Sequence, residues 1–363
     1  MKRWIFALAL LICCSCGASA EMIWEAQTPQ RLRTTVGEGG WTVDVDAEIY
    51  GMDVETVQAY RVKKRNWGRS PELLPGLEAL LSDPLRCEKR TGWTAEDVTL
   101  THPSGTRLHL SPWGNTFASP SGERLFEAVW AVPFSHITFR EQLEIGELPH
   151  LSLGEAVAMA EAAADTLGMT LGATPLDGKA VTLADMMQAV QARKEWGLSP
   201  NETIIEDWTQ ADAHYRLMLP QYFHGLMLYP TQSSIPGREN TPVSAVGLIV
   251  RREGLEYLSA DFVPGEESEQ DEPFTPIPVE QALEAGVAEL ASSAVAADMG
   301  NPRVRQAWLC YVPVADKGST TQYTAVPAWA FVIHYDDLTG CQEPALCNMP
   351  IAVDARTGEC LTR

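Results

Sequence analysis

Residues 41–48 alternate strictly between apolar and polar side chains, and this pattern restricts what the chain can fold into more than any other. The apolar set is Trp41, Val43, Val45 and Ala47, and the polar set is Thr42, Asp44, Asp46 and Glu48. Successive side chains of a strand point to opposite faces of a sheet, so a period of two indicates a half-buried strand. A glycine-rich break at 37–40 precedes this run and predicts a hairpin. The chain therefore needs a sheet with one buried face and one acidic face.

Short extended runs and turn residues continue through the first part of the chain. Further strands are predicted at 57–63, 98–100, 107–110 and 125–132. Pro-Ser-Gly occurs at 103–105 and again at 120–122, and we interpret both copies as turns. We therefore expect a β-rich N-terminal domain over residues 21–150, with antiparallel strands and short connections.

Helix signals appear in the second part of the chain, where strand signals follow them. Ser152 and Glu155 form a capping box, in which each side chain satisfies a backbone N–H group at the start of a helix. Helices are predicted near 152–167, 182–196 and 278–299. We predict an α+β fold, in which the β-rich part is followed by two helix-plus-antiparallel-sheet units. This second domain would span 151–363, as a tandem of 151–264 and 275–363.

The first twenty residues have the features of a signal peptide. A positively charged start at 2–3 precedes an apolar run at 4–14, which is shorter than the roughly 20 residues that span a bilayer. Cys16 follows the small Ser15, as in a lipoprotein signal. We therefore expect a lipid on Cys16 that holds the protein at the outer face of the cytoplasmic membrane. The alternative is ordinary cleavage after Ala20, because Ala-Ser-Ala at 18–20 fits that pattern too; the protein would then be secreted.

Five cysteines lie beyond this leader, and their spacing does not match a zinc site. Disulfides form outside the cytoplasm, where the leader would deliver the chain. A disulfide between Cys341 and Cys347 would close a short loop. Cys310 and Cys360 would form a second one, because both fall in predicted strands near the C-terminus. Buried thiols without a disulfide stay open as the alternative.

The chain is acidic, with a net charge of −21 that becomes −23 once the leader is removed. This charge repels nucleic acid and anionic lipid headgroups. We therefore expect no nucleic acid among the partners, and contact with the membrane through the lipid anchor only. Residues 265–272 are rich in acids but lack the spacing of a calcium loop, so we interpret them as a solvated loop.

Common catalytic motifs are missing from the sequence. It has no His-Glu-x-x-His, no Gly-x-Ser-x-Gly elbow, and no glycine loop of the P-loop or dinucleotide-binding type. We therefore expect no enzymatic activity, no catalytic residue, no cofactor and no bound metal. The aromatic residues suggest a binding role instead, since Tyr222, Tyr229, Trp308 and Trp329 could line a groove for a peptide or a glycan. The alternative is that these four pack the core.

The C-terminal half resembles a PepSY-like module. The resemblance rests on Pro-Ala-Trp-Ala-Phe at 327–331 and on Ile-Ala-Val-Asp-Ala-Arg-Thr-Gly-Glu at 351–359. Such modules pair a helix with a sheet, and they occur in protease propeptides and in extracytoplasmic regulators such as the YycH and YycI proteins. The whole chain also resembles an uncharacterised family of Gram-positive surface lipoproteins, through its leader and its strands at 42–47 and 60–62. These resemblances imply a place at the cell envelope and bring no catalytic residue with them.

Together, these observations predict a non-enzymatic extracytoplasmic lipoprotein that binds or regulates another cell-envelope protein or a peptide. Strand addition to an open sheet edge is the mode of contact that we expect. Two alternatives stay open. The first is a solute- or glycan-binding lipoprotein, and the second is an inhibitor of a secreted protease, which follows from the propeptide resemblance alone.

Overall fold

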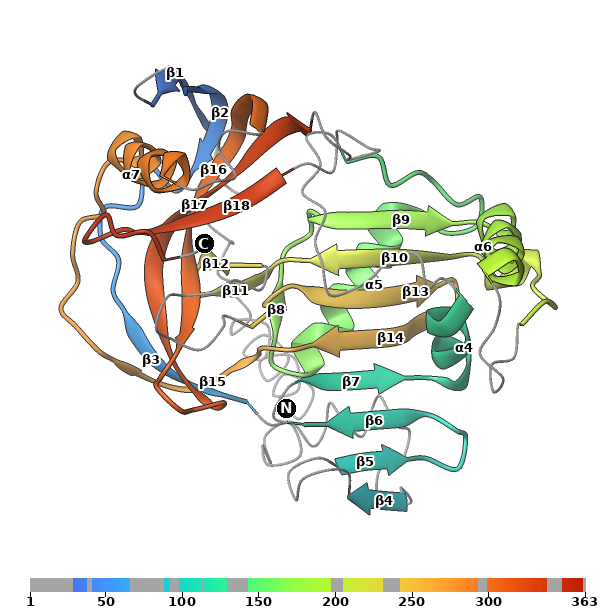
Figure 1. Ribbon diagram of the computed structural model, residues 1–363. Helices are drawn as coiled ribbons and strands as arrows, with labels where there is room; N and C mark the ends of the chain where they lie inside the picture. The colour runs from blue at the N-terminus through green and yellow to red at the C-terminus, as the bar shows by residue number, and fades with distance from the viewer. Residues whose placement is uncertain are drawn as a thin grey trace, which may run out of the picture.

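The computed structural model describes residues 29–37, 41–65, 88–91, 98–111, 114–128, 143–196, 205–230, 242–292, 299–337 and 348–361. In these residues, two large sheets lie side by side, and four α-helices pack against them (Figure 1). No helix in this part of the chain is long and apolar enough to cross a membrane.

The first sheet has ten strands and curves into a half-barrel, which is the name we use for it below. Its main path runs in the order β15-β3-β17-β16-β12-β11-β8; β2 also pairs with β16, β1 with β2, and β18 with β17. The strands are β1 Gln30–Val36, β2 Val43–Tyr50, β3 Tyr60–Lys64, β8 Thr170–Leu171, β11 Gln221–Phe223, β12 Leu226–Leu228, β15 Pro264–Glu269, β16 Met299–Ala315, β17 Gln322–Asp337 and β18 Asn348–Asp354. Most pairs are antiparallel, but β2 and β12 both run parallel to β16.

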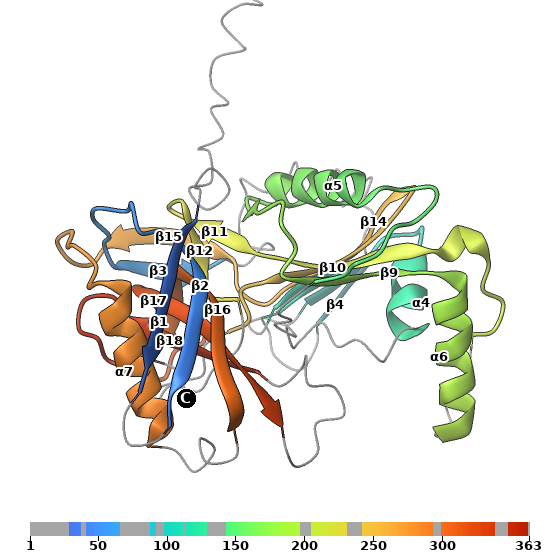
Figure 2. The ribbon, with the colours of Figure 1, turned by 90° about the horizontal axis from the view of Figure 1, so that it is seen from above.

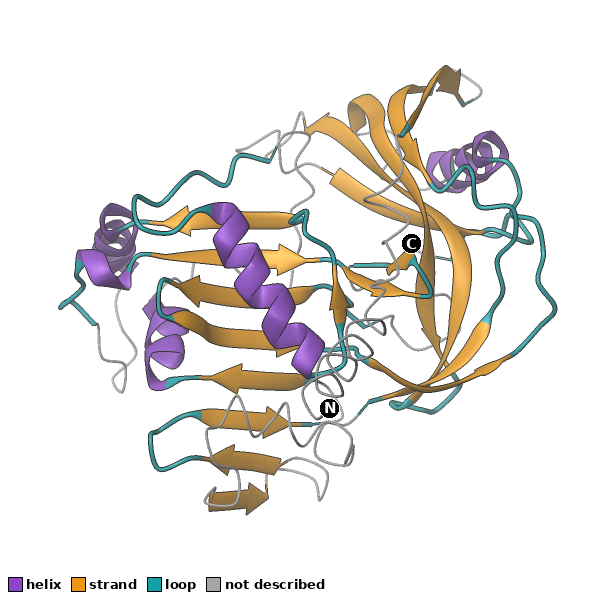
Figure 3. Cartoon of the chain, turned by 180° about the vertical axis from the view of Figure 1, so that it is seen from behind, coloured by secondary structure: helices purple, strands orange, loops and turns teal. Residues whose placement is uncertain are grey.

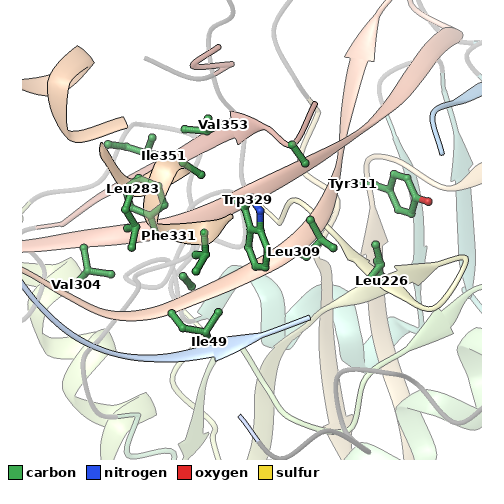
Figure 4. Packing of buried hydrophobic residues seen from close by; sticks show 14 of the residues in the cluster. Ile49, Leu226, Leu283, Val304, Leu309, Tyr311, Trp329, Phe331, Ile351 and Val353 are labelled. Atoms are coloured by element: carbon green, nitrogen blue, oxygen red, sulfur yellow. The ribbon is translucent and has the colours of Figure 1, made fainter. Parts of the chain in front are cut away.

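Helix α7 (Val279–Ala291) packs on one face of the half-barrel and closes its core. The helix forms because its apolar residues recur at intervals of three and four, which gathers them on one side. Those buried side chains are Val279, Ala282, Leu283, Val287 and Leu290. Figure 4 shows Leu283 beside Phe331 of β17 and Ile351 of β18, with side chains of β2 and β16 completing the cluster.

The second sheet has eight strands in the order β4-β5-β6-β7-β14-β13-β10-β9, and we call it the open sheet. All of its neighbouring strands are antiparallel. The strands are β4 Glu88–Thr91, β5 Val98–Thr101, β6 Arg107–Leu110, β7 Asn115–Ala118, β9 Asp177–Val181, β10 His214–Leu219, β13 Val246–Arg251 and β14 Gly254–Ala260. Helix α5 (Leu153–Thr166) crosses one face of this sheet, while α4 (Pro120–Ala128) and α6 (Leu183–Trp196) pack on the other (Figures 2 and 3).

A further apolar cluster joins the two sheets. Trp308 and Cys310 of β16 pack in it with Met218 of β10 and Tyr222 of β11. Its other fully buried members are Met227, Tyr229, Val243, Ala245, Val312, Val314, Ala328, Ala330, Val332, Ala352 and Leu361. We call this set the joining cluster. Because it draws on strands of both sheets, it fixes how one sheet sits against the other.

The predicted fold, α+β with a β-rich N-terminal part followed by two PepSY-like helix-plus-sheet units, is wrong. Early and late strands share both sheets, since β2 pairs with β16 and β7 pairs with β14. Pairing therefore crosses residue 150 in each sheet. After α5, β9 and β10 enter the open sheet, whereas β8, β11 and β12 enter the half-barrel. Periodicity shows which face of a strand is buried but does not name its neighbour, so the local pattern could not reveal this distribution.

Two predictions about local structure are confirmed, unlike the prediction of the topology. The alternation predicted over 41–48 is confirmed from Val43 onward, because every second side chain of β2 is buried. The capping box is confirmed too: the Glu155 N–H donates to Ser152 Oγ at 3.3 Å, and the Ser152 N–H donates to Glu155 Oε2 at 2.9 Å. The third predicted helix is shorter than expected, since α7 ends at Ala291 and Met299 already belongs to β16.

Two predicted connections are regular elements in the structure. Residues 120–122 begin helix α4, in which the Gly122 N–H donates to Ser119 Oγ at 2.8 Å in the manner of an N-cap. The strand predicted over 125–132 is therefore wrong as far as the structure describes it, because 125–128 are helical. The acidic loop expected at 265–272 is also wrong in its first half, since residues up to Glu269 form β15 and pair with β3.

Candidate functional site

The four aromatic residues proposed to line a groove are all buried. Trp329 lies in the core of the half-barrel and donates its Nε1 hydrogen to the Ile277 carbonyl at 2.8 Å. Tyr222, Tyr229 and Trp308 belong to the joining cluster. Their exposed fractions are 5%, 1% and 4%, and that of Trp329 is 3%. Side chains buried to this degree stabilise the core and do not offer a surface to a ligand.

The predicted disulfide between Cys310 and Cys360 is absent. Cys310 belongs to the joining cluster, whereas Cys360 packs against the half-barrel core, so the two thiols contact different cores. Burial raises the pKa of the Cys310 thiol well above its usual range, which keeps this sulfur protonated and unreactive. Cys16, Cys341 and Cys347 lie outside the described residues, so the lipid site and the second predicted disulfide stay predictions.

A partly exposed group of four rings lies where β3 meets the β11–β12 hairpin, and we call it the ring cluster. It consists of Tyr60, Phe223, His224 and Tyr311. Tyr60 and His224 stack face to face, with centroids 4.1 Å apart and planes inclined by 4°. Phe223 and Tyr311 meet Tyr60 edge-on, at centroid distances of 5.5 and 5.9 Å. Such geometry orients the rings firmly, because edge-to-face and stacked pairs add to the stabilisation from burial.

Backbone geometry fixes the position of His224 in this cluster. His224 and Gly225 form a two-residue loop between β11 and β12, and both have positive φ, of 47° and 77°. A two-residue hairpin loop with positive φ at both positions matches the twist of its strands. Gly225 adopts this backbone without strain, and histidine tolerates it better than most other residues do. The loop therefore places the imidazole against Tyr60.

An acidic side chain completes the site. Glu267 Oε2 lies 3.0 Å from His224 Nε2, and the two side chains are 39% and 36% exposed. Partial burial raises the pKa of Tyr60, and the charges of Glu267 and Glu269 raise it further, so the phenol stays neutral. Burial also raises the pKa of Tyr311. The site thus places the ring of Tyr60 near the carboxylates of Glu267 and Glu269, and an aromatic ring beside negative charge attracts a cation through both the ring quadrupole and the charge.

Ionisable side chains also form a buried row on the α4–α6 face of the open sheet. His214 and Arg216 of β10 lie on the face opposite Tyr215, which packs in the α5 core. Burial lowers the pKa of Arg216 to about 10, an effect that nearby Tyr257 of β14 opposes. Burial raises the pKa of Tyr257, while hydrogen bonds from the side chains of β7 and β14 and the Arg216 charge act the other way.

The row continues to the junction of the two sheets. Burial lowers the pKa of Lys64, at the end of β3, to about 8, and the charge of Asp261 partly opposes the shift. Burial raises the pKa of Asp261, and Lys64 opposes that shift in turn. Perturbed groups of this kind occur both at catalytic sites and in structural networks. No group of three His, Cys, Asp or Glu residues suited to a metal ion occurs among the described residues.

Next to this row, an ion-pair network ties α4 to the open sheet. Arg251 Nε donates to Glu256 Oε1 at 2.8 Å, and its guanidinium lies 3.7 Å from Asp212. The other Glu256 oxygen accepts a hydrogen bond from the Ser119 hydroxyl, which itself caps α4. Every member is engaged by protein groups, so we assign this network a structural role.

The comparisons with known proteins inform the fold alone. The chain matches no family model and no curated protein. Its structure is similar to the crystal structure of an uncharacterized protein from Eubacterium rectale ATCC 33656, with a TM-score of 0.63 and 16% sequence identity, over 92% of this chain and 93% of that one. At this identity the likeness shows a shared fold and leaves the function open.

Sequence reasoning did not single out the ring cluster. Tyr60 falls in a strand predicted at 57–63, while Phe223, His224 and Tyr311 come from segments far from it along the chain. A weak local signal was present, however, because a glycine between two apolar runs is compatible with a two-residue hairpin loop, although Asn-Gly and Asp-Gly are the pairs typical of such loops. The meeting of that loop with β3 and β15 could not be read from the sequence, since the three segments are far apart along the chain.

Proposed function

We propose that this protein is an exported binding protein, without catalytic activity, that contacts a cationic segment of another cell-envelope protein. The observation that carries the proposal is the stacked pair of Tyr60 and His224 with Glu267 beside it. A lysine or arginine over such a ring gains about 0.5–1 kcal/mol at an exposed site, and about 2 kcal/mol when it is desolvated. Contact with a neighbouring carboxylate adds about 0.2–1 kcal/mol.

The charge of the whole chain supports the same class of partner. A net charge of −21 creates a field that draws basic molecules toward the surface and repels acidic ones. The chemistry at the ring cluster then favours those whose cations reach a ring face. The solute- or glycan-binding alternative depended on aromatic residues that would line a groove, and Tyr222, Tyr229, Trp308 and Trp329 are buried. These four residues therefore do not support it. No observation favours protease inhibition.

Export and anchoring form part of the proposal through the leader sequence. A diacylglyceryl group on Cys16 would hold the protein at the outer face of the cytoplasmic membrane. The mass of the mature protein from its native membrane tests this, together with release of a Cys16→Ser variant. If the mature chain instead begins at Glu21 and carries no lipid, the protein is secreted and not anchored.

Binding of pentalysine by the full-length protein tests the recognition step. We expect Glu267→Gln to weaken binding about two- to fivefold, the effect of one exposed ion pair. Glu284→Gln makes the same change of charge on the exposed side of α7, away from the rings, and should leave the affinity within about twofold. Tyr60→Leu tests the contribution of the ring.

The substitution that tests His224 must tolerate a backbone with positive φ. Alanine would add strain to the loss of the ring, whereas asparagine tolerates this backbone. We therefore expect His224→Asn to weaken pentalysine binding with little loss of stability. Equal affinities for the wild type, Glu267→Gln and His224→Asn would contradict the proposal, as would equal effects of Glu267→Gln and Glu284→Gln.

A further inference from the structure

Strand β15 forms an open edge of the half-barrel next to the ring cluster. It ends the strand order of that sheet, and β3 is its one partner among the described strands. Residues 266–269 are all exposed, and residues 270–273 continue the exposed run. An exposed edge strand presents a row of N–H and C=O groups that can pair with another chain.

The hydrogen bonds around β15 show which residues present that row. The Gln270 N–H donates to the Ala59 carbonyl at 3.0 Å, so the backbone of residue 270 faces β3. Residues alternate along an antiparallel pair, which turns Ser268 toward β3 as well, opposite Arg61. The N–H and C=O groups of Glu267 and Glu269 therefore point away from β3. No described residue pairs with them.

The acidic side chains of β15 flank this edge on both faces of the sheet. Glu267 is opposite Val62 and Glu269 is opposite Tyr60, so both lie on the face that carries the ring cluster. On the other face, Glu266 Oε2 lies 3.3 Å from Lys63 Nζ. A strand added at the edge would therefore run directly beside Glu267 and Glu269, with β15 between it and Tyr60 of β3.

We propose that the partner adds an extended, basic segment as a further strand on the outer edge of β15. This inference rests on the proposed function and adds the mode of contact to it. Lysine or arginine at alternate positions of the added strand would meet Glu267 and Glu269, while its backbone would pair with their outward N–H and C=O groups. A second copy of β15 would place carboxylates opposite carboxylates, so the same charges disfavour self-association and select a basic strand.

A proline substitution separates backbone pairing from charge. Glu269→Pro removes an outward N–H group, and proline is tolerated in an edge strand at a position whose N–H group does not pair. The β15–β3 ladder stays intact, because the lost N–H group is not part of it. Glu269→Thr removes the same charge and keeps the N–H group, so it is the matched control. Thermal unfolding of both variants verifies that they fold.

The probe is a short, blocked peptide of alternating lysine and valine, compared with the same peptide N-methylated at alternate residues. We expect the unmethylated peptide to bind Glu269→Pro about three- to tenfold more weakly than it binds Glu269→Thr, the effect of losing backbone hydrogen bonds. N-methylation should weaken binding to the wild type by a similar factor, because it removes donors and leaves the charge unchanged.

The outcomes distinguish this inference from the proposed function. Strand addition would be overturned if the wild type bound the methylated and unmethylated peptides equally and if Glu269→Pro and Glu269→Thr bound the unmethylated peptide equally. The proposed function would still stand in that case if pentalysine binding depended on Glu267. Failure of the wild type to bind either pentalysine or the lysine–valine peptide would overturn both. A drop in affinity confined to Glu269→Pro and to the methylated peptide would support strand addition.

Discussion

At the scale of single residues, His214 shows how burial sets the ionisation of a side chain. Its ring is completely buried, and Nδ1 lies 2.9 Å from the Asp212 carbonyl, so Nδ1 carries the hydrogen and donates it. Nε2 has no hydrogen-bond partner among the residues that the structure describes. Burial lowers the pKa of His214 to about 4, and the charges of Arg216 and Arg251 contribute to the shift. The folded protein therefore holds this imidazole in its neutral form.

This ionisation makes stability depend on pH in a defined window. Between pH 6.5 and about 4 the unfolded chain binds a proton at His214 that the folded chain does not, so stability is lost as the pH falls. The loss amounts to about 3 kcal/mol for such a difference in pKa. His214→Asn keeps a donor near the Asp212 carbonyl and cannot titrate. We expect the variant to be less stable at pH 7 but to lose less stability from pH 7 to pH 4, as urea unfolding would show. Equal losses in both proteins would contradict the assignment.

At the scale of elements, α7 depends on a glycine to approach the half-barrel. A Cβ at Gly286 would lie 2.5 Å from Phe331 Cζ and 3.1 Å from Ile351 Cγ2. Both neighbours are buried in the half-barrel core, where close packing leaves little room to shift. The sequence of α7 explains why a helix forms, while this glycine explains how near to the sheet it lies.

The packing of α7 can be tested with a pair of glycine variants. Gly286→Ala gains about 1 kcal/mol of helix propensity but overpacks the core, at a cost of about 1–3 kcal/mol, so we expect a net loss of stability. Gly154→Ala in the first turn of α5 is the control, because a Cβ there meets nothing within 4 Å. That variant should gain about 0.4–1 kcal/mol. Urea unfolding measures both, and a Gly286→Ala protein more stable than the wild type would refute the close approach.

At the scale of the whole molecule, the two sheets are interwoven along the chain. In the described strands the path alternates between half-barrel and open sheet, with β1–β3, β8, β11–β12 and β15–β18 in the first and the rest in the second. The fully buried Gln221 of β11 adds a polar tie. Its Nε2 donates to the carbonyls of Ser244 at 3.1 Å and Phe262 at 2.7 Å, just before β13 and just after β14. Because the chain passes repeatedly between the two sheets, unfolding of one sheet would break contacts that stabilise the other.

This interweaving predicts one cooperative unfolding unit. Amide hydrogens in the central strands β13 and β17 should exchange through the same global opening, with equal free energies and equal dependence on denaturant. Native-state hydrogen exchange with mass spectrometry would measure both strands in one experiment. Different free energies that persist as denaturant is added would show that the half-barrel and the open sheet unfold separately.

The sequence by itself determined features that depend on neighbouring residues. The period of two fixed the buried face of β2, and the capping box fixed the start of α5, because a strand pleat and a helix turn span only a few residues. The turn at 103–105 belongs to this class, with Gly105 at a φ of 91° between β5 and β6. The ring cluster was beyond such reasoning, since its residues come from three distant segments.

Tertiary structure alone decided the features that depend on distant partners. The second Pro-Ser-Gly, at 120–122, forms a helix turn because Ser119 caps it and Gly122 packs against the backbone of Glu256, where a Cβ would lie 1.9 Å from the carbonyl oxygen. The acids of β15 form a strand because β3 supplies a ladder for them, although glutamate has little preference for strands. The parallel pairing of β2 with β16 joins residues more than half the chain apart. Burial against these partners supplies more free energy than local preference does, and the partners exist only once the chain has folded.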